Sequence, residues 1–327
     1  MKALVAGGTG FIGSHVVKDL VSKGIQVRVL IRKNSHIRFL PHKEIEFIQG
    51  NILDINSLRN HTEDVDLVYS AFGILGQWGI SEQMYREVNT KGVKNLLESC
   101  LDGQIKQFIH ISSAGVLGPL PDGVVADESF PYNPSNIYEK TKCEAEKEIL
   151  KCDEKYGVPF TIIRPEFVYG PRDTHVLRLF KAIRAKRFFL LGNGQSFLHP
   201  TYIDDLIQGI SICTDNENAV GKIFLITGDK PLPVKELAEI IAEELDVRLP
   251  KIRIPLLFAH TTAKIMELVA KVAHFDPPLT RSRVKFFTEN RAFSCQKART
   301  ELGYIPKVDF REGVRRTISW YREDSFL

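Results

Sequence analysis

Residues 3–15 read ALVAGGTGFIGSH, and no other short segment says as much about the architecture of the chain. An apolar run leads directly into Gly7, Gly10 and Gly13, and a segment with helical spacing follows. In such a turn the first glycine permits a tight reversal, the second lets the backbone approach a pyrophosphate, and the third lets the helix pack close to the strand. The start of the helix offers free N–H groups and a positive dipole end to phosphates. The stretch therefore predicts a strand, a turn and a helix that bind a dinucleotide.

The alternation of strand and helix continues through the first half of the chain. Short apolar runs predict strands, and segments with helical spacing predict the helices between them. The expected strands cover 2–6, 26–32, 45–52, 65–72, 105–112 and 159–165, and the expected helices cover 12–24, 54–61, 81–101 and 136–157. Because strands that alternate with helices pair in parallel through crossovers, we predict an α/β fold with a doubly wound parallel Rossmann sheet.

This rhythm divides the chain into two parts. Residues 1–172 form the expected NAD(P)-binding Rossmann domain. Beyond it the alternation loosens, so residues 173–327 are expected to form mainly a smaller, mixed α/β substrate-binding lobe. Within that half, residues 200–228 are expected to return to the Rossmann domain. No internal repeat or low-complexity linker separates the two parts.

Composition and charge exclude several classes of function. The 327 residues carry a formal net charge of +4 and no long basic run, which argues against nucleic-acid binding. The five cysteines are scattered without a C-x-x-C pair, and the nine histidines lack H-x-x-x-H spacing. We therefore expect no metal site and a reducing, cytoplasmic location.

The most apolar late stretch is Ile254–Phe275. Lys264, Glu267 and Lys271 interrupt it, so it contains no clean span of about 20 apolar residues, and we expect no transmembrane segment. A buried or amphipathic helix is predicted instead. The sequence leaves open whether this helix touches a membrane surface or an apolar substrate.

A candidate for chemistry lies in SNIYEKTKCEAEKEI, residues 135–149. Tyr138 precedes Lys142 by four residues, so the two side chains share one face of the expected helix. The hydroxyl of tyrosine normally has a pKa near 10, which is too high for an efficient base at neutral pH, and a nearby positive charge lowers it. This spacing alone is common on helix surfaces, so the rest of the chain has to support the interpretation.

Several motifs in order make the chain resemble the extended short-chain dehydrogenases/reductases of the NAD-dependent epimerase/dehydratase superfamily. AGGTGFIG resembles that family's T-G-x-x-G-x-x-G turn, with Ala6 where threonine is usual. HISSAGVLG, YEKTK, RPEFVYGPR, HPTYIDDL and ARTELGYIP follow in the family's order, from residue 1 to about residue 322. The resemblance implies that Tyr138 is the acid/base, that Lys142 holds the ribose hydroxyls, and that Ser113 binds the substrate oxygen. Ser112 is expected instead to donate to backbone at the end of its strand.

The resemblance also implies where the cofactor binds. The expected contacts are Gly7, Thr9, Gly10, Phe11, Ile12, Gly13, Arg32, Asn51, Ile52, Ser70, Ala71, Phe72, Tyr138, Lys142, Pro165 and Val168. After the second expected strand, an acidic residue would signal NAD, but the sequence has Arg32, which suits a 2′-phosphate. We therefore favour NADP. In the alternative, NAD binds while Arg32 stacks on the adenine or lies in solvent.

The expected reaction follows from the residues on the substrate side. Phe167 and Leu198 stand where family members that use sugar nucleotides carry polar ligands for a diphosphate. An apolar surface binds such a group poorly. The chain most resembles the branch of 3β-hydroxysteroid dehydrogenases and dihydroflavonol reductases, which implies an oxidoreductase of a bulky, largely apolar ketone or alcohol. The expected substrate contacts are Gln77, Trp78, Ala114, Phe167 and His199.

Two other functions stay open from the sequence. One is a nucleotide-sugar epimerase or dehydratase with tightly bound NAD. The other is a redox sensor that binds NADP without turnover, although such a protein needs no proton donor at Tyr138. The resemblance further implies a homodimer that uses the Tyr138 helix.

Overall fold

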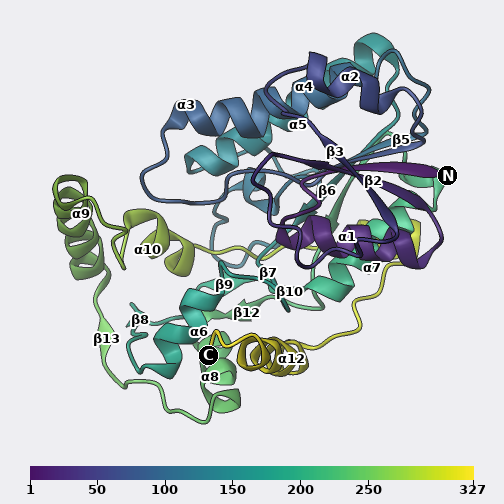
Figure 1. Ribbon diagram of the computed structural model, residues 1–327. Coiled ribbons are helices and arrows are strands. Elements are labelled where there is room, and N and C mark those ends of the chain that lie inside the picture. Colours follow the sequence, from purple (N-terminus) through teal and green to yellow (C-terminus); the bar gives the residue numbers. More distant parts are fainter.

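A seven-stranded parallel sheet forms the centre of the computed structural model, which describes all 327 residues (Figure 1). The strand order is β3-β2-β1-β4-β5-β6-β11. The strands are β1 (Lys2–Ala6), β2 (Gln26–Ile31), β3 (Ile45–Gln49), β4 (Leu67–Ser70), β5 (Gln107–Ile111), β6 (Phe160–Pro165) and β11 (Lys222–Ile226). The order reverses between β1 and β4, and the crevice at the carboxyl ends of the strands beside such a reversal is where doubly wound sheets bind their ligands.

The alternation of side chains along β1 explains the two helical layers. Ala3 and Val5 belong to the core formed with α1 (Phe11–Ser22) and α7 (Ile203–Thr214), whereas Leu4 and Ala6 belong to the opposite core. That opposite core is covered by α2 (Asn56–Thr62), α4 (Gly92–Ser99) and α5 (Ile137–Tyr156). Because successive side chains of a strand point to opposite faces, a strand that is apolar throughout must be covered on both sides.

The helix expected at 81–101 is interrupted in the middle. It consists of α3 (Glu82–Tyr85), a π-helical turn at Arg86–Lys91, and α4. Such single π turns inside α-helices are frequent at functional sites. Here the π turn contains Asn89, whose contacts with the site are described below.

The remaining elements form most of a smaller lobe beneath the sheet (Figure 1). Three two-stranded ribbons pair β7 with β10, β8 with β13, and β9 with β12. The strands are β7 (Val168–Tyr169), β8 (Leu190–Leu191), β9 (Phe197–Leu198), β10 (Thr201–Tyr202), β12 (Leu232–Pro233) and β13 (Arg253–Ile254). The helices are α6 (Leu177–Arg184), α8 (Val234–Glu244), α9 (Leu256–Ala273), α10 (Arg281–Thr288) and α12 (Phe310–Glu323). The remaining helix, α11 (Gln296–Leu302), packs instead against β11 and α7 of the Rossmann part.

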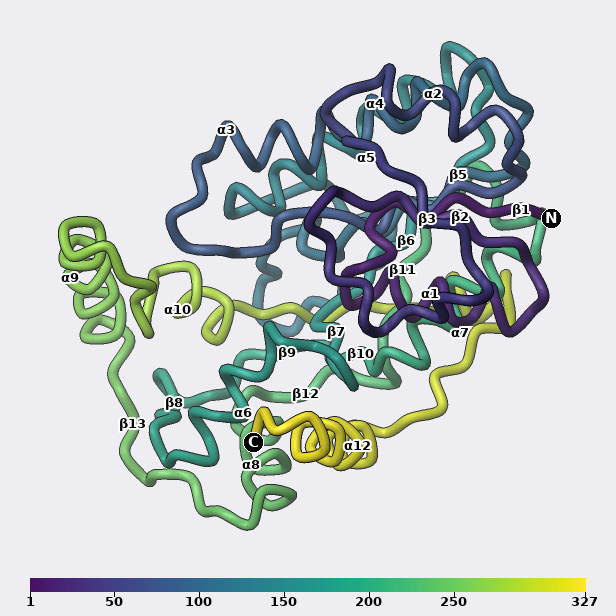
Figure 2. Tube along the Cα trace, in the orientation of Figure 1, coloured from purple at the N-terminus to yellow at the C-terminus, as the bar shows by residue number.

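The chain passes between the two parts more than once, as the colours in Figure 2 show. After α6 and the ribbon strands, it returns through α7, which packs against α1, to β11, which pairs with β6 at the edge of the main sheet. It then leaves again through α8 and α9.

Helix α9 turns its small residues toward the protein and its large apolar side chains toward the outside. Its buried residues are Ala259, Ala263, Glu267 and Ala270, whereas its large apolar side chains, such as Leu257 and Val272, are exposed. The sequence predicted a buried or amphipathic helix, and the large apolar residues turn out to lie on the outer face. No helix of the structure has the length and apolar character needed to cross a membrane.

Candidate active site

The glycine turn between β1 and α1 has the geometry that a pyrophosphate requires. Gly7 has φ +89°, and a Cβ added there would lie 2.5 Å from the carbonyl oxygen of Ala71. A Cβ on Gly13 would lie 2.2 Å from the carbonyl oxygen of Gly7, so this position admits only glycine. At Gly10 the only close neighbour would be that same carbonyl oxygen, at 3.2 Å, and no side chain caps α1. The first turn of α1 is thus left open to an anionic group.

The other residues predicted to bind the nucleotide gather at the carboxyl ends of the parallel strands. Thr9, Phe11 and Ile12 belong to the glycine turn and the first turn of α1. Ser70, Ala71 and Phe72 end and follow β4, Asn51 and Ile52 follow β3, and Pro165 and Val168 lie at the end of β6 and the start of β7. Because the strands are parallel and in register, these segments meet at one edge of the sheet.

Arg32 follows β2 directly at this edge. Its side chain is exposed and makes no hydrogen bond or ion pair, while its backbone N–H donates to Ser35 Oγ at 2.9 Å. Asn51 is exposed as well, and its Oδ1 accepts a hydrogen bond from the N–H of Leu53 at 3.0 Å. A free guanidinium beside the second strand is suited to bind a phosphate oxygen.

Helix α5 carries the candidate acid/base and is fixed at both ends. The side chain of Asn136 caps its N-terminus by accepting from the N–H of Glu139 at 3.0 Å, and Gly157 ends it in the left-handed conformation. Tyr138 therefore lies in the first turn, where its side chain keeps partial exposure. Lys142 lies one turn further, is buried, and donates from Nζ to the carbonyl oxygen of Ile111 at 2.7 Å.

The protonation of Tyr138 is set mainly by its surroundings in the protein. Burial raises the pKa of its hydroxyl well above the ordinary value, the nearby carboxyls of Glu166 and Glu139 raise it further, and the adjacent Ser113 hydroxyl lowers it. Burial also lowers the pKa of Lys142 to about 8. Nζ of Lys142 is hydrogen-bonded to the backbone of β5, and its effect on the ionisation of Tyr138 stays a prediction.

Ser113 and Ser112 have different surroundings. Ser113 follows β5, caps the 3-10 turn Ala114–Leu117 through the N–H of Gly115, and lies next to Tyr138. Ser112 donates to Glu146 Oε1 at 2.5 Å, a side-chain partner where a backbone partner was expected. The two serines therefore point to different neighbours, and Ser113 is the one beside Tyr138.

A buried ionic network lies behind Ser112 and α5. Both oxygens of Glu146 accept hydrogen bonds from Arg164, at 3.0 and 2.6 Å, and Oε2 also accepts from the hydroxyl of Tyr132 at 2.8 Å. The side chains of Arg164 and Glu146 are only 2% and 0% exposed. This network ties α5 to β6 and to the end of β5, and so holds the helix that carries Tyr138.

A group of three charged residues next to Tyr138 was not identified from the sequence. Arg291 Nη2 contacts Glu139 Oε1 at 2.7 Å, and the carboxyl of Glu166 interacts with both Arg291 and Glu139. All three residues are buried, and burial raises the pKa of Glu166 to about 7. Glu166 follows Pro165 directly, but Glu139 and Arg291 are distant in sequence, so no local pattern could have indicated the group.

Asn89 in the π turn fixes the segment that follows β4. Its Oδ1 accepts from the N–H of Ile74 at 2.7 Å, and its Nδ2 donates to the carbonyl oxygen of Ile74 at 3.1 Å and to Thr141 Oγ1 at 3.0 Å. The side chain is fully buried. Asn89 thereby connects the loop after β4 to α5, one residue before Lys142.

The residues predicted to contact substrate occupy different positions. Phe167 is half-buried with φ 37°, and its ring lies 5.7 Å from that of Phe286 on α10. Trp78 is half-buried, and Gln77 is exposed, with its N–H donating to the hydroxyl of Tyr85 at 2.8 Å. Phe167 and Phe286 thus form an aromatic pair, and the loop that contains Gln77 and Trp78 is fixed to Tyr85 of α3.

Ala114 and His199 are placed differently from what the sequence predicted. Ala114 is fully buried, and His199 is 2% exposed. His199 Nε2 lies 3.0 Å from the carbonyl oxygen of Gly228, and Nδ1 accepts from the N–H of Phe293. With both ring nitrogens bonded to backbone, His199 connects loops and has no group free for a substrate.

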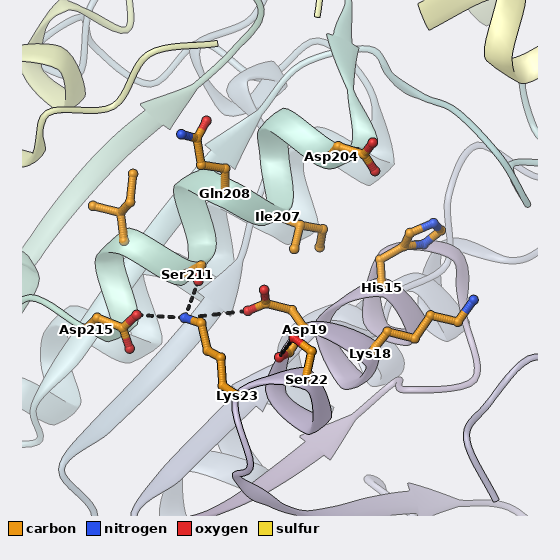
Figure 3. Close-up of a pocket in the computed structure, with 11 residues that line it drawn as sticks. His15, Lys18, Asp19, Ser22, Lys23, Asp204, Ile207, Gln208, Ser211 and Asp215 are labelled. Carbon is orange, nitrogen blue, oxygen red and sulfur yellow. Dashed lines mark hydrogen bonds and ion pairs between the residues drawn. The ribbon is translucent and has the colours of Figure 1, made fainter. Parts of the chain in front are cut away.

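A recess of about 570 Å³ lies between α1 and α7, on a polar surface (Figure 3). Lys23 crosses it, with Nζ bonded to Ser211 and Asp215 and close to Asp19. None of the candidate residues described above lines this recess, so we do not assign it to the site.

Comparisons with known proteins agree with this geometry. Residues 3–227 match the model of the NAD dependent epimerase/dehydratase family. The chain is 30% identical to 3beta-hydroxysteroid-dehydrogenase/decarboxylase isoform 1 of Arabidopsis thaliana, over 96% of this chain and 78% of that protein. It is 29% identical to 2-alkyl-3-oxoalkanoate reductase of Stenotrophomonas maltophilia, over 97% and 98%.

A solved structure supports the same fold. The dTDP-glucose 4,6-dehydratase of Streptomyces venezuelae, determined with NAD bound, superposes with a TM-score of 0.81 at 24% identity, covering 100% of this chain and 98% of that one. The family match, the relatives, the glycine turn and the Ser113–Tyr138–Lys142 arrangement lead to one conclusion. The chain belongs to the NAD-dependent epimerase/dehydratase family and is an enzyme of the extended short-chain dehydrogenase/reductase type.

Proposed function

We propose that the protein is an NADP-preferring oxidoreductase that transfers a hydride between nicotinamide and a bulky, largely apolar ketone or alcohol. The observation that carries this proposal is the adjacency of the Ser113 and Tyr138 hydroxyls. Glu166, which also acts on Tyr138, directly precedes Phe167, whose ring lies 5.7 Å from that of Phe286. When bound, the dinucleotide supplies or accepts the hydride. The chain's own residues position the substrate and move the proton.

Tyr138 is proposed to exchange the proton with the substrate oxygen. Its raised pKa keeps the hydroxyl protonated, which suits donation to a carbonyl oxygen as that oxygen gains negative charge. Ser113 is proposed to donate a hydrogen bond to the same oxygen, since its hydroxyl lies beside Tyr138. Lys142 is proposed to bind the ribose hydroxyls through Nζ.

The charges around Tyr138 favour a substrate without a diphosphate over a sugar nucleotide. Arg291 is already paired with Glu139, and Glu166 adds a second carboxyl to the same buried group. A diphosphate placed there would face two acidic groups and a neutralised arginine, which is an unfavourable arrangement. Phe167 adds an apolar surface. The relatives named above act, by their names, on a 3β-hydroxysteroid and on a 2-alkyl-3-oxoalkanoate, which supports the class of substrate.

The preference for NADP rests on Arg32. Its exposed, unpaired guanidinium follows β2, and no acidic residue stands at that position. A 2′-phosphate would form a charge-assisted hydrogen bond there, whereas the 2′-hydroxyl of NAD would not gain this contact.

The acid/base role is tested by Tyr138→Phe, with Tyr156→Phe as the matched control. Tyr156 lies at the other end of α5 and is 54% exposed. With NADPH and a panel of cyclic and long-chain ketones, we expect Tyr138→Phe to lose turnover by at least about 100-fold while dinucleotide binding stays within about two-fold. Near-normal turnover by Tyr138→Phe would reject the role.

The cofactor preference is tested by calorimetric titration of nucleotide-stripped protein with NADP and with NAD. We expect tighter binding of NADP, and Arg32→Ala should weaken NADP binding about 10-fold or more without affecting NAD. Arg248 is an exposed and unpaired arginine in the smaller lobe. Arg248→Ala is therefore the control and should change the binding of neither NADP nor NAD. Purified protein that carries NAD and binds it preferentially would favour the epimerase or dehydratase function. Strong NADP binding without turnover on any ketone or alcohol would favour the sensor.

Two further features belong to the proposal. The first is a cytoplasmic location, supported by five cysteines that are all free thiols in the structure. The second is a homodimer in which α5 forms part of the interface, as the family resemblance implies. Sedimentation equilibrium tests the dimer, and a monomer at micromolar concentration would exclude it.

A further inference from the structure

Helix α9 presents an outer face made of large apolar side chains. Small residues, Ala259, Ala263 and Ala270, face the protein together with Glu267. The opposite side carries Leu257, Phe258, Ile265, Leu268, Val269 and Val272, which are between 52% and 82% exposed. We call these six residues the outer face. At 100° per residue they share one side of the helix, opposite the alanines, with exposed Thr261 between the first two residues and the other four.

The outer face is far more apolar than the exposed side of an ordinary surface helix. A surface helix normally turns its apolar stripe toward the core and its charges toward water. At roughly 100 Å² for each such side chain, the outer face reaches about 600 Å², the upper end of what monomeric proteins expose in one patch. Exposed Ile252, just before the helix, extends it. A patch of this size marks an interaction surface.

The charges around the outer face are positive. Lys264 and Lys271 lie along one flank of the helix and are exposed, and Lys251 and Arg253 flank Ile252. The single acidic residue of the helix, Glu267, is buried and bonded to Arg281, with Nε to Oε2 at 2.7 Å. Apolar residues bordered by long cationic side chains match the boundary of an anionic bilayer, where the stems lie among acyl chains and the ammonium groups reach the headgroups.

We propose that the outer face of α9 docks on the surface of an anionic lipid bilayer, with the helix axis in the plane of the membrane. No helix of the chain can cross a membrane, so the contact is peripheral. A second copy of the same face is a poorer occupant, because the lysine flank would then meet another lysine flank without acidic partners. Figure 1 shows α9 at the far edge of the smaller lobe, next to α10, and the six residues of the outer face are exposed.

This docking has a consequence for substrate delivery that rests on the proposed function. Ala259 and Ala263 of α9 pack against Val284 of α10, and Phe286 of α10 contacts Phe167 at the candidate substrate surface. The substrate surface is thus one helix away from the docking face. A bulky apolar ketone dissolved in the bilayer would reach it without first crossing water.

The docking is tested without cofactor or substrate, so its failure is separate from a failure of the proposed function. The full chain is floated with vesicles of phosphatidylcholine alone and with vesicles containing 30% phosphatidylglycerol, a composition on the order of natural anionic membranes. We expect binding to the anionic vesicles, at least 10-fold weaker binding to the neutral ones, and a loss of binding as salt rises.

Variants identify the face that binds. Leu268→Glu with Val272→Glu should lower binding to anionic vesicles by at least 10-fold, and Lys264→Gln with Lys271→Gln should lower it several-fold. Val125→Glu with Ile305→Glu adds the same charge at two other exposed apolar positions, which are 56% and 60% exposed, and should leave binding within about two-fold. Thermal unfolding confirms that each variant is folded.

Two outcomes would overturn the proposal. One is absence of binding to both vesicle types by the wild-type chain. The other is a dimer in solution that Leu268→Glu with Val272→Glu abolishes while vesicle binding is absent, which would assign the outer face to a second copy of the chain.

Discussion

Replacing Gly10 by alanine should weaken dinucleotide binding while leaving the stability of the fold nearly unchanged. Gly10 has φ −78° and ψ −179°, a conformation open to any residue, and an added Cβ would meet only the carbonyl oxygen of Gly7, at 3.2 Å. Alanine is a poorer helix cap than glycine but restricts the unfolded chain, and these opposing effects are each within about 1 kcal/mol. We therefore expect the free energy of unfolding of Gly10→Ala to stay within about 1 kcal/mol of the wild type.

The same methyl group should impair cofactor binding. A pyrophosphate at the start of α1 approaches the backbone of Gly10, so the methyl would occupy space that the phosphate needs. Overpacking of this kind costs about 1–3 kcal/mol, which corresponds to a dissociation constant about 5- to 150-fold higher. Calorimetric titration with NADP measures the loss, and urea unfolding measures the stability.

Gly13→Ala provides the contrast. Its Cβ would lie 2.2 Å from the carbonyl oxygen of Gly7, a backbone atom that cannot move aside like a flexible side chain, so both stability and NADP binding should fall. Gly24→Ala is the control, since nothing lies within 4 Å of its Cβ, and its φ of +70° should cost only about 1 kcal/mol with no effect on NADP. The reasoning is refuted if Gly10→Ala is stable and binds NADP as tightly as the wild type.

Three further predictions concern the surroundings of Tyr138. Arg164→Leu leaves Glu146 buried without its cation and should lower the free energy of unfolding by about 3–5 kcal/mol. The double change Arg164→Leu with Glu146→Leu should cost clearly less. Urea titration measures both variants, and an effect below about 1 kcal/mol for Arg164→Leu alone would contradict the buried pair. Because the pKa of Glu166 is raised to about 7, the folded chain holds more protons than the unfolded chain between pH 4.5 and 7, and this group should lower the free energy of unfolding by up to about 3 kcal/mol as pH rises through that window. Glu166→Gln should remove this pH dependence, which urea titrations at each pH measure. An unchanged pH dependence would exclude the assignment. Asn89→Ala should release Ile74 and lower kcat by about 10-fold or more in the ketone assay while the chain stays folded by circular dichroism, and unchanged kcat would show that the tether does not act on the site.

The parts of the fold that the sequence predicted are those with local signals. Gly7 and Gly13 are required by backbone contacts a few residues away or across one strand, and the apolar strands need covering on both faces whatever their partners. Helix α5 has a local start at Asn136 and a local end at Gly157. The predicted family and fold class are confirmed by the family match and the sheet topology.

The parts that the sequence did not predict depend on contacts between distant segments. The sequence of Arg86–Lys91 gives no local signal for a π turn. The turn is associated with the hydrogen bonds of the Asn89 side chain to Ile74 and Thr141, which lie in other segments. The sequence around His199 gives no sign of its hydrogen bond to the carbonyl oxygen of Gly228, which is distant along the chain. In α9 the face with the alanines and the face with the large apolar side chains are both apolar. Periodicity alone therefore does not tell which of the two faces packs against the protein.

The electrostatics of the site explain why the two carboxyls near Tyr138 matter for the direction of proton transfer. Glu139 and Glu166 both raise the pKa of Tyr138, and Lys142 is bonded to the backbone of β5, so the protein by itself holds the tyrosine as a proton donor. A donor is what the reduction of a carbonyl needs, since the oxygen becomes an alcohol by gaining that proton. Abstraction of a proton from an alcohol needs the ionised tyrosine, which here would require positive charge beyond that supplied by the chain. The arrangement thus suits the step proposed for Tyr138, the donation of a proton to a substrate carbonyl.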